Sequence, residues 1–290
     1  MLTTLHQLLV KAEKKKFAIP AFNVTNLETA LAVVRAAVKT KSPVIIQTSE
    51  AAIQYAGHQT LLRIMENVIA ELSGTVPIVT HLDHGKHFET VKASVNLGYR
   101  SVHMDASEQP YDDNVSLTKK AVTLGHAKKI TVQGELGYLL GYEGMMKMKS
   151  MKQMTPLLTD PEQAKDFAQK TGVDTLAVAV GTAHGMFRGK EKVDFQRLIA
   201  IKQLTGKPLV LHGGSGVYEA DIRKAISFGI RIINIDTDLR LSFMSGLQTA
   251  MKSYDPTKKV DVREPLGAAA LTMEKEAITM IRLLGSANQA

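Results

Sequence analysis

Short runs rich in β-branched residues alternate with longer segments of helical periodicity along the whole chain of 290 residues. Apolar residues spaced by about 3.6 predict amphipathic helices, whereas short apolar runs bounded by turn residues predict buried strands. Eight strands are expected, at residues 18–23, 43–49, 77–82, 101–105, 131–136, 175–182, 208–212 and 231–235. The helical segments between them include 27–41, 61–72, 88–97, 162–170 and 195–204. Eight successive strand–helix units favour an α/β fold, the (β/α)8 TIM barrel.

An open, doubly wound sheet is the alternative fold for such an alternation. That fold usually carries a Gly-x-Gly-x-x-Gly turn after its first strand, where this chain has residues 21–24, Ala-Phe-Asn-Val. No linker interrupts the pattern, so we expect residues 1–290 to form a single barrel domain. A further helical segment, 266–284, follows the eighth unit as an additional C-terminal helix.

The composition limits the kinds of functional site. The chain has no cysteine, which excludes disulfides, thiolate nucleophiles and cysteine-ligated metals. Any metal must therefore be held by carboxylates and by the nine histidines.

Lysine and arginine outnumber aspartate and glutamate by 36 to 28, which gives a net charge of +8. This charge suits nucleic acid, a membrane surface or phosphorylated small molecules, or serves solubility alone. Basic runs such as 14–16 lack the interleaved aromatic residues of a nucleic-acid surface, and no apolar run approaches the ~18 residues of a membrane span. The N-terminal segment does not begin with the charges of a secretory signal. We therefore expect a cytoplasmic protein with no nucleic-acid or membrane partner.

Polar residues gather where predicted strands end, and in a barrel the active site forms at the C-terminal strand ends. Four strands end in polar segments, at 81–85, 181–185, 211–216 and 234–238, and the first three of these contain glycine. Three of these segments carry a histidine: His84, His184 and His212. One such histidine is more often a hydrogen-bonded pocket residue, but three favour a catalytic zinc with an open coordination position.

Asp83 adjoins His84, and a carboxylate near a Lewis-acidic metal can move a proton. Orienting a histidine is its alternative role. Strict strand alternation would place Asp83 and His84 on opposite faces, so we expect the strand to turn here. His81 is expected to pack against or orient Asp83, and His103, in the middle of a strand, is not expected to be a ligand.

Further candidate site residues lie at the C-terminal ends of the strands. Asp105 and Glu135 end the fourth and fifth strands and would either bind a second metal or neutralise local charge. Residues 213–216 and 234–237 lie where barrels build phosphate sites from backbone N–H groups and a helix N-terminus. A tight turn without a ligand is the alternative for the glycine-rich segment.

Taken in order, these motifs resemble the class II, metal-dependent fructose-bisphosphate aldolases over the whole chain. The matching segments are 21–24, 82–85, 104–107, 134–137, 183–185, 212–216, 234–238 and 285–289. The resemblance implies a lyase of glycolysis and gluconeogenesis that reversibly cleaves fructose 1,6-bisphosphate to dihydroxyacetone phosphate and glyceraldehyde 3-phosphate. Cleavage without a lysine imine leaves an enediolate whose negative oxygen needs a cation, which zinc would supply.

The resemblance also implies individual roles. His84, His184 and His212 would hold catalytic Zn²⁺, Asp105 and Glu135 would form a second divalent position, and Asp83 would be the acid/base at the C4 hydroxyl. Glu143 would exchange a proton at the nascent carbanion from a mobile loop. Arg263 would reach the other phosphate from a neighbouring subunit, which implies a homodimer or homotetramer. A monovalent cation, Na⁺ or K⁺, beside the phosphate is left open. The residues that would bind the dihydroxyacetone phosphate half are Ser49, Gly185, Gly213, Gly214, Ser215, Asn234, Ile235, Asp236 and Thr237.

The chain departs from the family pattern in two places. Residues 145–154 hold five of the 13 methionines in place of an acidic stretch, which favours an adaptable lid over a partner surface. Thr257 follows Asp255-Pro256 where the family has arginine, and Arg263 comes only after Val262.

Three alternatives to a fructose-bisphosphate aldolase are weighed. Tagatose 1,6-bisphosphate cleavage differs in the configuration of one hydroxyl. A Schiff-base aldolase needs a lysine on a barrel strand, and the predicted strands contain none. A non-catalytic metal-binding or surface-interaction barrel is disfavoured because Asp83 accompanies all three histidines.

Overall fold

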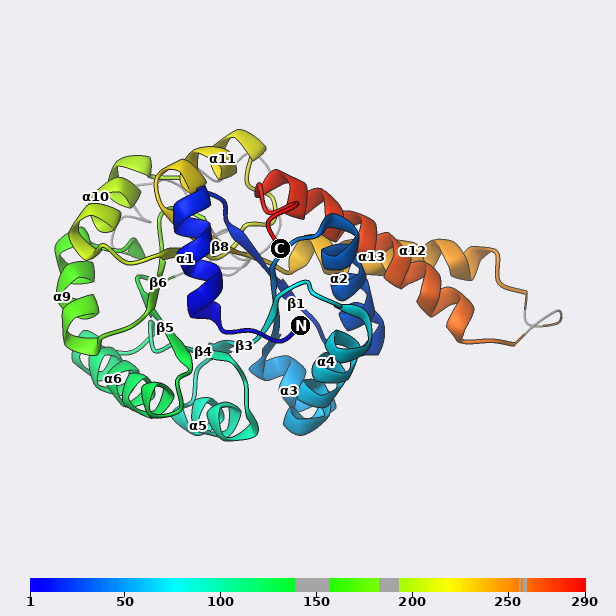
Figure 1. Cartoon of the computed structure of the whole chain (residues 1–290), viewed down its shortest axis with the longest axis horizontal. Helices are drawn as coiled ribbons and strands as arrows, with labels where there is room; N and C mark the ends of the chain where they lie inside the picture. The colour runs from blue at the N-terminus through cyan, green and yellow to red at the C-terminus, as the bar shows by residue number, and fades with distance from the viewer. Residues whose placement is uncertain (139–156, 183–192, 256, 258–259) are drawn as a thin grey trace.

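The computed structural model describes residues 1–138, 157–182, 193–255, 257 and 260–290. Parallel strands close into a barrel in sequence order, and β1 pairs with both β2 and β8. The TIM-barrel prediction is therefore confirmed (Figure 1). The strands are β1 (Ile19–Asn23), β2 (Val44–Ser49), β3 (Ile78–Gly85), β4 (Ser101–Met104), β5 (Thr131–Leu136), β6 (Thr175–Val178), β7 (Leu209–Leu211) and β8 (Ile230–Ile235).

Helices surround the barrel, and those expected at 27–41, 61–72, 88–97, 162–170 and 195–204 are present close to those bounds. Several begin at a side-chain cap: Asn26 forms a capping box with Thr29 at the start of α2, and Asp160 accepts from the Gln163 N–H at the start of α9. The surrounding helices are α2 (Leu27–Thr40), α3 (Glu50–Ala56), α4 (His58–Leu72), α5 (Phe88–Leu97), α6 (Tyr111–Ala127), α9 (Pro161–Thr171), α10 (Phe195–Thr205) and α11 (Glu219–Ser227).

Helix α1 (Leu5–Lys15) closes one end of the barrel, and it lies across the barrel in Figure 1. Its buried side chains Leu5, Leu8 and Leu9 form one apolar cluster with inward-facing strand residues such as Ile45 and Val79. The strand residues next in sequence to these inward-facing ones belong instead to the larger core between strands and helices. This division follows the alternation of side chains along a strand. The end covered by α1 is therefore apolar, which leaves the opposite end for a polar site.

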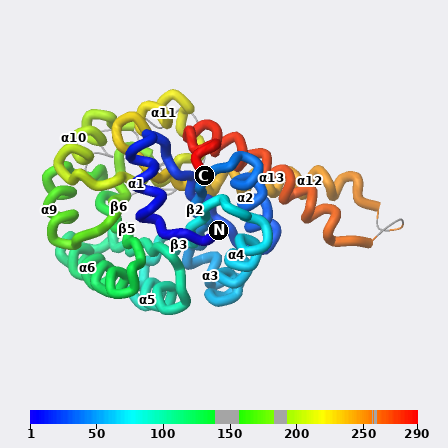
Figure 2. Tube along the Cα trace, viewed as in Figure 1, coloured from blue at the N-terminus to red at the C-terminus, as the bar shows by residue number. Residues whose placement is uncertain are grey.

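Two long helices, α12 (Thr237–Lys252) and α13 (Arg263–Leu283), extend from the barrel as an antiparallel arm (Figures 1 and 2). Helix α13 is the additional C-terminal helix, and its C-terminal part packs beside α2. Gly246 permits the close approach of the two arm helices, because a Cβ there would lie 2.5 Å from Thr272 Oγ1 and 3.0 Å from Ala269 Cα. The arm also exposes apolar side chains, including Leu241, Met244 and Leu271. None of the helices that the structure describes is both long and apolar enough to cross a bilayer.

Polar side chains fill the barrel interior at the end opposite α1. On β5, Thr131, Gln133 and Glu135 alternate with Val132 and are all buried. Because alternate strand residues face the same side, this pattern projects the polar side chains into the barrel. Buried polar residues on or just after other strands include Gln47, His81, His103, His212 and Asn234.

Candidate metal centre and active site

The end of β3 turns sharply at His84. Its φ of 46° lies in the left-handed region, and the pairing with β4 shifts register between Leu82 and Gly85. Gly85 lets the strands approach, since a Cβ there would lie 2.6 Å from the carbonyl oxygen of His103. The turn expected from the adjacent Asp83 and His84 is therefore present, and both side chains belong to the same cluster of metal-ligating groups. Left-handed geometry in a residue other than glycine costs about 1–3 kcal/mol, which the surrounding packing must maintain.

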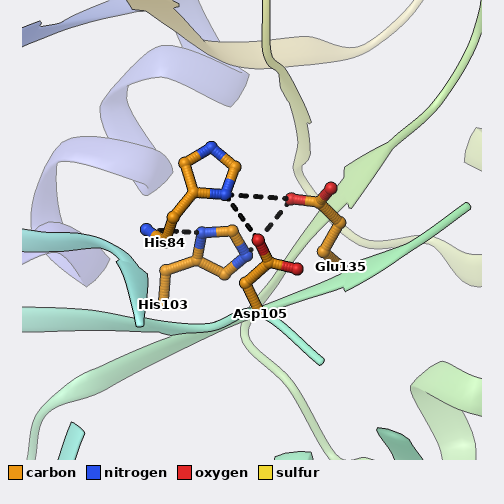
Figure 3. A group of neighbouring side chains, drawn as sticks. All are labelled: His84, His103, Asp105 and Glu135. Atoms are coloured by element: carbon orange, nitrogen blue, oxygen red, sulfur yellow. Dashed lines mark hydrogen bonds and ion pairs between the residues drawn. The ribbon is translucent and has the colours of Figure 1, made fainter. Parts of the chain in front are cut away.

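One cluster of side chains comes from the ends of three consecutive strands (Figure 3). His84 Nδ1 lies 2.6 Å from Asp105 Oδ2 and 3.9 Å from Glu135 Oε2, and His103 Nε2 lies 3.4 Å from Glu135 Oε2. Ligand atoms of all four residues fall within 4.8 Å of one another. The arrangement brings together Asp105 and Glu135, for which the sequence leaves a second divalent position and charge neutralisation open.

A second cluster joins Asp83, His84 and His212, again with ligand atoms within 4.8 Å of one another. His84 Nε2 lies 3.9 Å from Asp83 Oδ1, and the His84 and His212 ring centroids are 4.5 Å apart. His184, the third predicted zinc ligand, lies outside the described residues, as do Gly185 and Glu143.

Electrostatics favour a cation among these groups. Burial would lower the pKa of His84, but the charge of Asp83 and the hydrogen bond to Asp105 raise it to about 10. Burial would raise the pKa of Asp105, but that hydrogen bond and the charge of His103 hold it well below its usual range. Burial and the charge of Asp105 raise the pKa of Glu135 well above its usual range. Glu135 Oε2 is buried and accepts no hydrogen bond from the residues that the structure describes. Buried carboxylates with an unused oxygen are stabilised by a bound cation, so the donor set fits a divalent metal.

The carboxylate of Asp83 accepts hydrogen bonds from two side-chain amides. Asn23 Nδ2, at the end of β1, donates to Asp83 Oδ2 at 2.8 Å, and Asn234 Nδ2, on β8, donates to Oδ1 at 3.0 Å. The sequence predicts that His81 packs against or orients Asp83. The structure corrects the orienting role, because His81 Nδ1 forms its hydrogen bond with Ser101 Oγ, at 2.9 Å, instead. Burial lowers the pKa of His81 to about 3, so this ring is a neutral interior group.

His103 is the residue that the sequence interpretation excluded and that the structure brings into the first cluster. Its position in the middle of a strand, and not at a strand end, is why the sequence does not favour His103 as a ligand. The alternation Ser101-Val102-His103-Met104-Asp105 contains the missing signal, because residues 103 and 105 share a strand face. His103 therefore lies beside Asp105 and deeper in the barrel.

The segments after β7 and β8 meet at the start of α12. The Asp238 N–H donates to Ser215 Oγ at 3.2 Å, and the Gly214 N–H donates to the Asn234 carbonyl at 3.2 Å. A Cβ on Gly214 would lie 2.5 Å from Ile233 Cγ2, so only glycine fits. Gly213, Gly214, Ser215 and residues 234–237 are thus gathered beside a helix N-terminus, where backbone N–H groups favour anions.

Two cavities meet at Ser49. One of about 390 Å³ is lined by Asn23, Ser49, Asp236 and Arg240 among others. Arg240 Nη2 pairs with Asp236 Oδ2 at 2.8 Å, and Arg240 is a polar contact that the sequence interpretation missed. Its signal is the spacing of four residues from Asp236 at the N-terminus of the helix after β8. The other cavity, of about 450 Å³, reaches His84, Asp105 and Glu135.

Arg263 lies apart from these cavities, at the first residue of α13 on the arm. Its side chain is 87% exposed and pairs with Asp261 at 2.8 Å. It lines neither of the two cavities described above.

Comparisons with known proteins agree with this geometry. A profile of the family "Fructose-bisphosphate aldolase class-II" matches residues 3–289. This chain belongs to the class II fructose-bisphosphate aldolase family. It is 34% identical over 290 residues to a fructose-bisphosphate aldolase of Geobacillus stearothermophilus, covering 100% of this chain and 99% of that protein. It is 35% identical over 294 residues to a probable fructose-bisphosphate aldolase of Bacillus subtilis, with the same coverage.

Among solved structures, the chain is similar to the YdjI aldolase of Escherichia coli K12. The TM-score is 0.84 and the identity 31%, and the match covers 100% of both chains. The family assignment makes this chain an aldolase, and therefore a lyase. Class II aldolases depend on a metal, and the clusters around His84 contain the nitrogen and oxygen donors that such a metal needs.

Proposed function

We propose that this class II aldolase reversibly cleaves fructose 1,6-bisphosphate to dihydroxyacetone phosphate and glyceraldehyde 3-phosphate. One observation carries the proposal: the carboxylate of Asp83 lies 3.9 Å from His84 Nε2, within a buried cluster that also holds His212. A proton acceptor beside a group of metal donors is what metal-assisted aldol cleavage requires.

We propose His84, His184 and His212 as the zinc ligands, with Asp105 and Glu135 as a second divalent position. When bound, zinc supplies a positive charge beside the ketone, where negative charge develops as the carbon–carbon bond breaks. The buried carboxyl of Glu135 supports this assignment, because a nearby cation stabilises its charged form.

The chain's own groups then move the protons. Asp83 accepts the proton of the C4 hydroxyl, the bond between C3 and C4 breaks, and C4 becomes the aldehyde carbon. The hydrogen bonds from Asn23 and Asn234 hold the Asp83 carboxylate in one orientation while it does so. We assign proton return at C3 to Glu143, which lies outside the described residues.

We propose that the dihydroxyacetone phosphate half binds beside the start of α12. Gly213, Gly214, Ser215 and the segment of Asn234, Ile235, Asp236 and Thr237 would bind it together with Gly185, and a monovalent cation, Na⁺ or K⁺, beside this phosphate remains an expectation. Ser49 and Asp236 both line the cavity of about 390 Å³. Arg240 is the guanidinium that lines this cavity, and it suits a second anionic group of the substrate.

We also propose a homodimer or homotetramer in which Arg263 enters the site of a neighbouring subunit. The exposed position of Arg263 and the apolar side chains of the arm support this arrangement, since exposed apolar patches commonly mark contacts between chains. A single domain over residues 1–290 and a cytoplasmic location likewise remain predictions.

The test combines metal content with cleavage rates. Thorough chelation should abolish cleavage of fructose 1,6-bisphosphate, and zinc or cobalt should restore it; activity that survives chelation would refute the metal mechanism. Comparison of kcat/KM for fructose and tagatose 1,6-bisphosphates would identify the preferred sugar. Trapping of a substrate adduct by borohydride would establish a Schiff-base aldolase instead.

A further inference from the structure

The imidazole of His212 is contacted by a side-chain amide at each ring nitrogen. Gln133 Nε2 lies 3.1 Å from His212 Nε2, and Asn234 Nδ2 lies 3.3 Å from His212 Nδ1. Gln133, His212 and Asn234 are all buried. The ring is therefore positioned by two amides that come from strands on either side of β7.

A neutral imidazole carries hydrogen on one nitrogen and a lone pair on the other. Two amide nitrogens cannot both donate to it, so one of the two amides must turn its oxygen towards the ring. Either amide can do so by a half-turn that leaves the heavy atoms in place.

The hydrogen bond to Asp83 fixes the orientation of the Asn234 amide, so the Gln133 amide is the one that turns. Asn234 Nδ2 donates to Asp83 Oδ1 at 3.0 Å, and a half-turn would set the Asn234 oxygen against that carboxylate. Asn234 therefore keeps its N–H groups towards Asp83 and His212 Nδ1. The ring must accept at Nδ1 and carry its hydrogen at Nε2.

We propose that Gln133 is a positioning residue: its amide oxygen accepts the Nε2 hydrogen of His212 and thereby keeps a lone pair at Nδ1, where a bound metal would take the place of the Asn234 N–H. The inference rests on the proposed function, in which His212 is a zinc ligand. Gln133 acts through His212 and has no assigned contact with substrate. Partners of this kind typically change metal affinity 10- to 100-fold when they are removed.

His84 is oriented in the same way, but with the roles of its two ring nitrogens exchanged. Its Nδ1 lies 2.6 Å from Asp105 Oδ2, so the hydrogen stays at Nδ1 and Nε2 is directed towards Asp83. His212 Nδ1 faces the amide that also holds Asp83. Asp105 and Gln133 thus orient two rings so that the nitrogens they do not contact, His84 Nε2 and His212 Nδ1, both lie on the Asp83 side. The acceptor is a carboxylate for one ring and a neutral amide for the other.

The substitution that tests this is Gln133→Leu, which keeps the side chain large but removes its acceptor. We expect zinc to bind about 10- to 100-fold more weakly, measured by competition with a chromophoric chelator. Gln133→Glu should bind zinc at least as tightly as the wild type, because a carboxylate accepts the Nε2 hydrogen more strongly. The matched control is Gln47→Leu, since Gln47 is equally buried but bonds Asn23, and its zinc affinity should be unchanged.

Nitrogen NMR shows directly which nitrogen of the His212 ring carries the hydrogen. Long-range ¹H–¹⁵N spectra of zinc-free enzyme with labelled histidine should show the hydrogen of His212 on Nε2, with a His212→Gln sample for assignment. A hydrogen on Nδ1, or wild-type zinc affinity in Gln133→Leu, would overturn the proposal. If Gln133→Leu does not fold, the wild-type spectrum and Gln133→Glu decide the matter. A chain that binds zinc as expected yet cleaves no sugar bisphosphate would refute the proposed function alone.

Discussion

Replacing Asp83 by alanine separates proton transfer from metal binding. General acid–base catalysis contributes about 10²–10⁴ in rate, which is about 3–5 kcal/mol of the activation barrier. We expect kcat for fructose 1,6-bisphosphate cleavage to fall by this factor. Zinc content should not change, because the 3.9 Å between Asp83 Oδ1 and His84 Nε2 is too long for a hydrogen bond.

The stability of this variant follows from the two amides left behind. Asn23 Nδ2 and Asn234 Nδ2 both lose their acceptor on Asp83, and an unsatisfied buried donor costs about 1–3 kcal/mol. Asn23 lines a cavity and can bond water instead, so the smaller cost applies to it. Removal of one carboxylate also relieves repulsion with Glu135 and Asp236. The net loss should stay small enough for the variant to fold.

The assay couples triose phosphate release to NADH oxidation, with zinc content and melting temperature measured on the same preparation. Asp166→Ala is the matched control, since Asp166 is an outer carboxylate of α9 that pairs with Lys170. A variant Asp83→Ala with zinc bound and a rate within about three-fold of wild type would remove Asp83 from the mechanism, because that is far below the 10²-fold minimum for a general base. Loss of zinc together with activity would instead place Asp83 among the metal ligands.

Four further outcomes are expected. Because the pKa of His84 is raised to about 10 in the zinc-free site, zinc must displace a proton, and its affinity should rise about ten-fold per pH unit between pH 7 and 9; a flat profile would contradict this. The same proton stabilises the zinc-free fold fully below about pH 6.5, and its contribution is lost as the pH rises through about 10, so the melting temperature of zinc-free enzyme should fall over that interval. Arg240→Ala should raise KM for the bisphosphate about ten-fold or more, with a smaller change in kcat, since loss of a charge-assisted contact costs about 1.5–3 kcal/mol; an unchanged KM would exclude Arg240 from substrate binding. Leu5→Ala should lower the free energy of unfolding by about 2–5 kcal/mol in denaturant titrations and leave kcat unchanged, because Leu5 lies at the end of the barrel opposite the site; a change in kcat would contradict that separation.

Local sequence pattern was sufficient to predict the barrel. Strand expectations such as 131–136 coincide with β5, because apolar alternation and flanking turns are properties of neighbouring residues. The prediction at 175–182 extends beyond β6, which ends at Val178. The segment Ala179–Val180 is apolar and buried, so composition alone does not reveal that pairing has stopped.

The candidate site was less accessible to sequence. The polar strand ends identified Asp83, His84 and His212, because barrel topology brings those ends together. The partners of Asp83 lie 60 and 151 positions away in the chain, and no local period encodes such contacts. Gln133 reads as an ordinary strand residue until its distance to His212 is known.

The two hydrogen bonds that hold Asp83 link catalysis to the seam of the barrel, the pairing of β1 with β8. Asn23 belongs to β1 and Asn234 to β8, and these two strands, at opposite ends of the strand order, pair with each other to close the ring. While that seam is open, Asp83 retains its neighbours from β2 but is separated from Asn234. During refolding, turnover should therefore recover with the pairing of β1 and β8, later than helix formation, so that enzyme activity serves as a clock for ring closure.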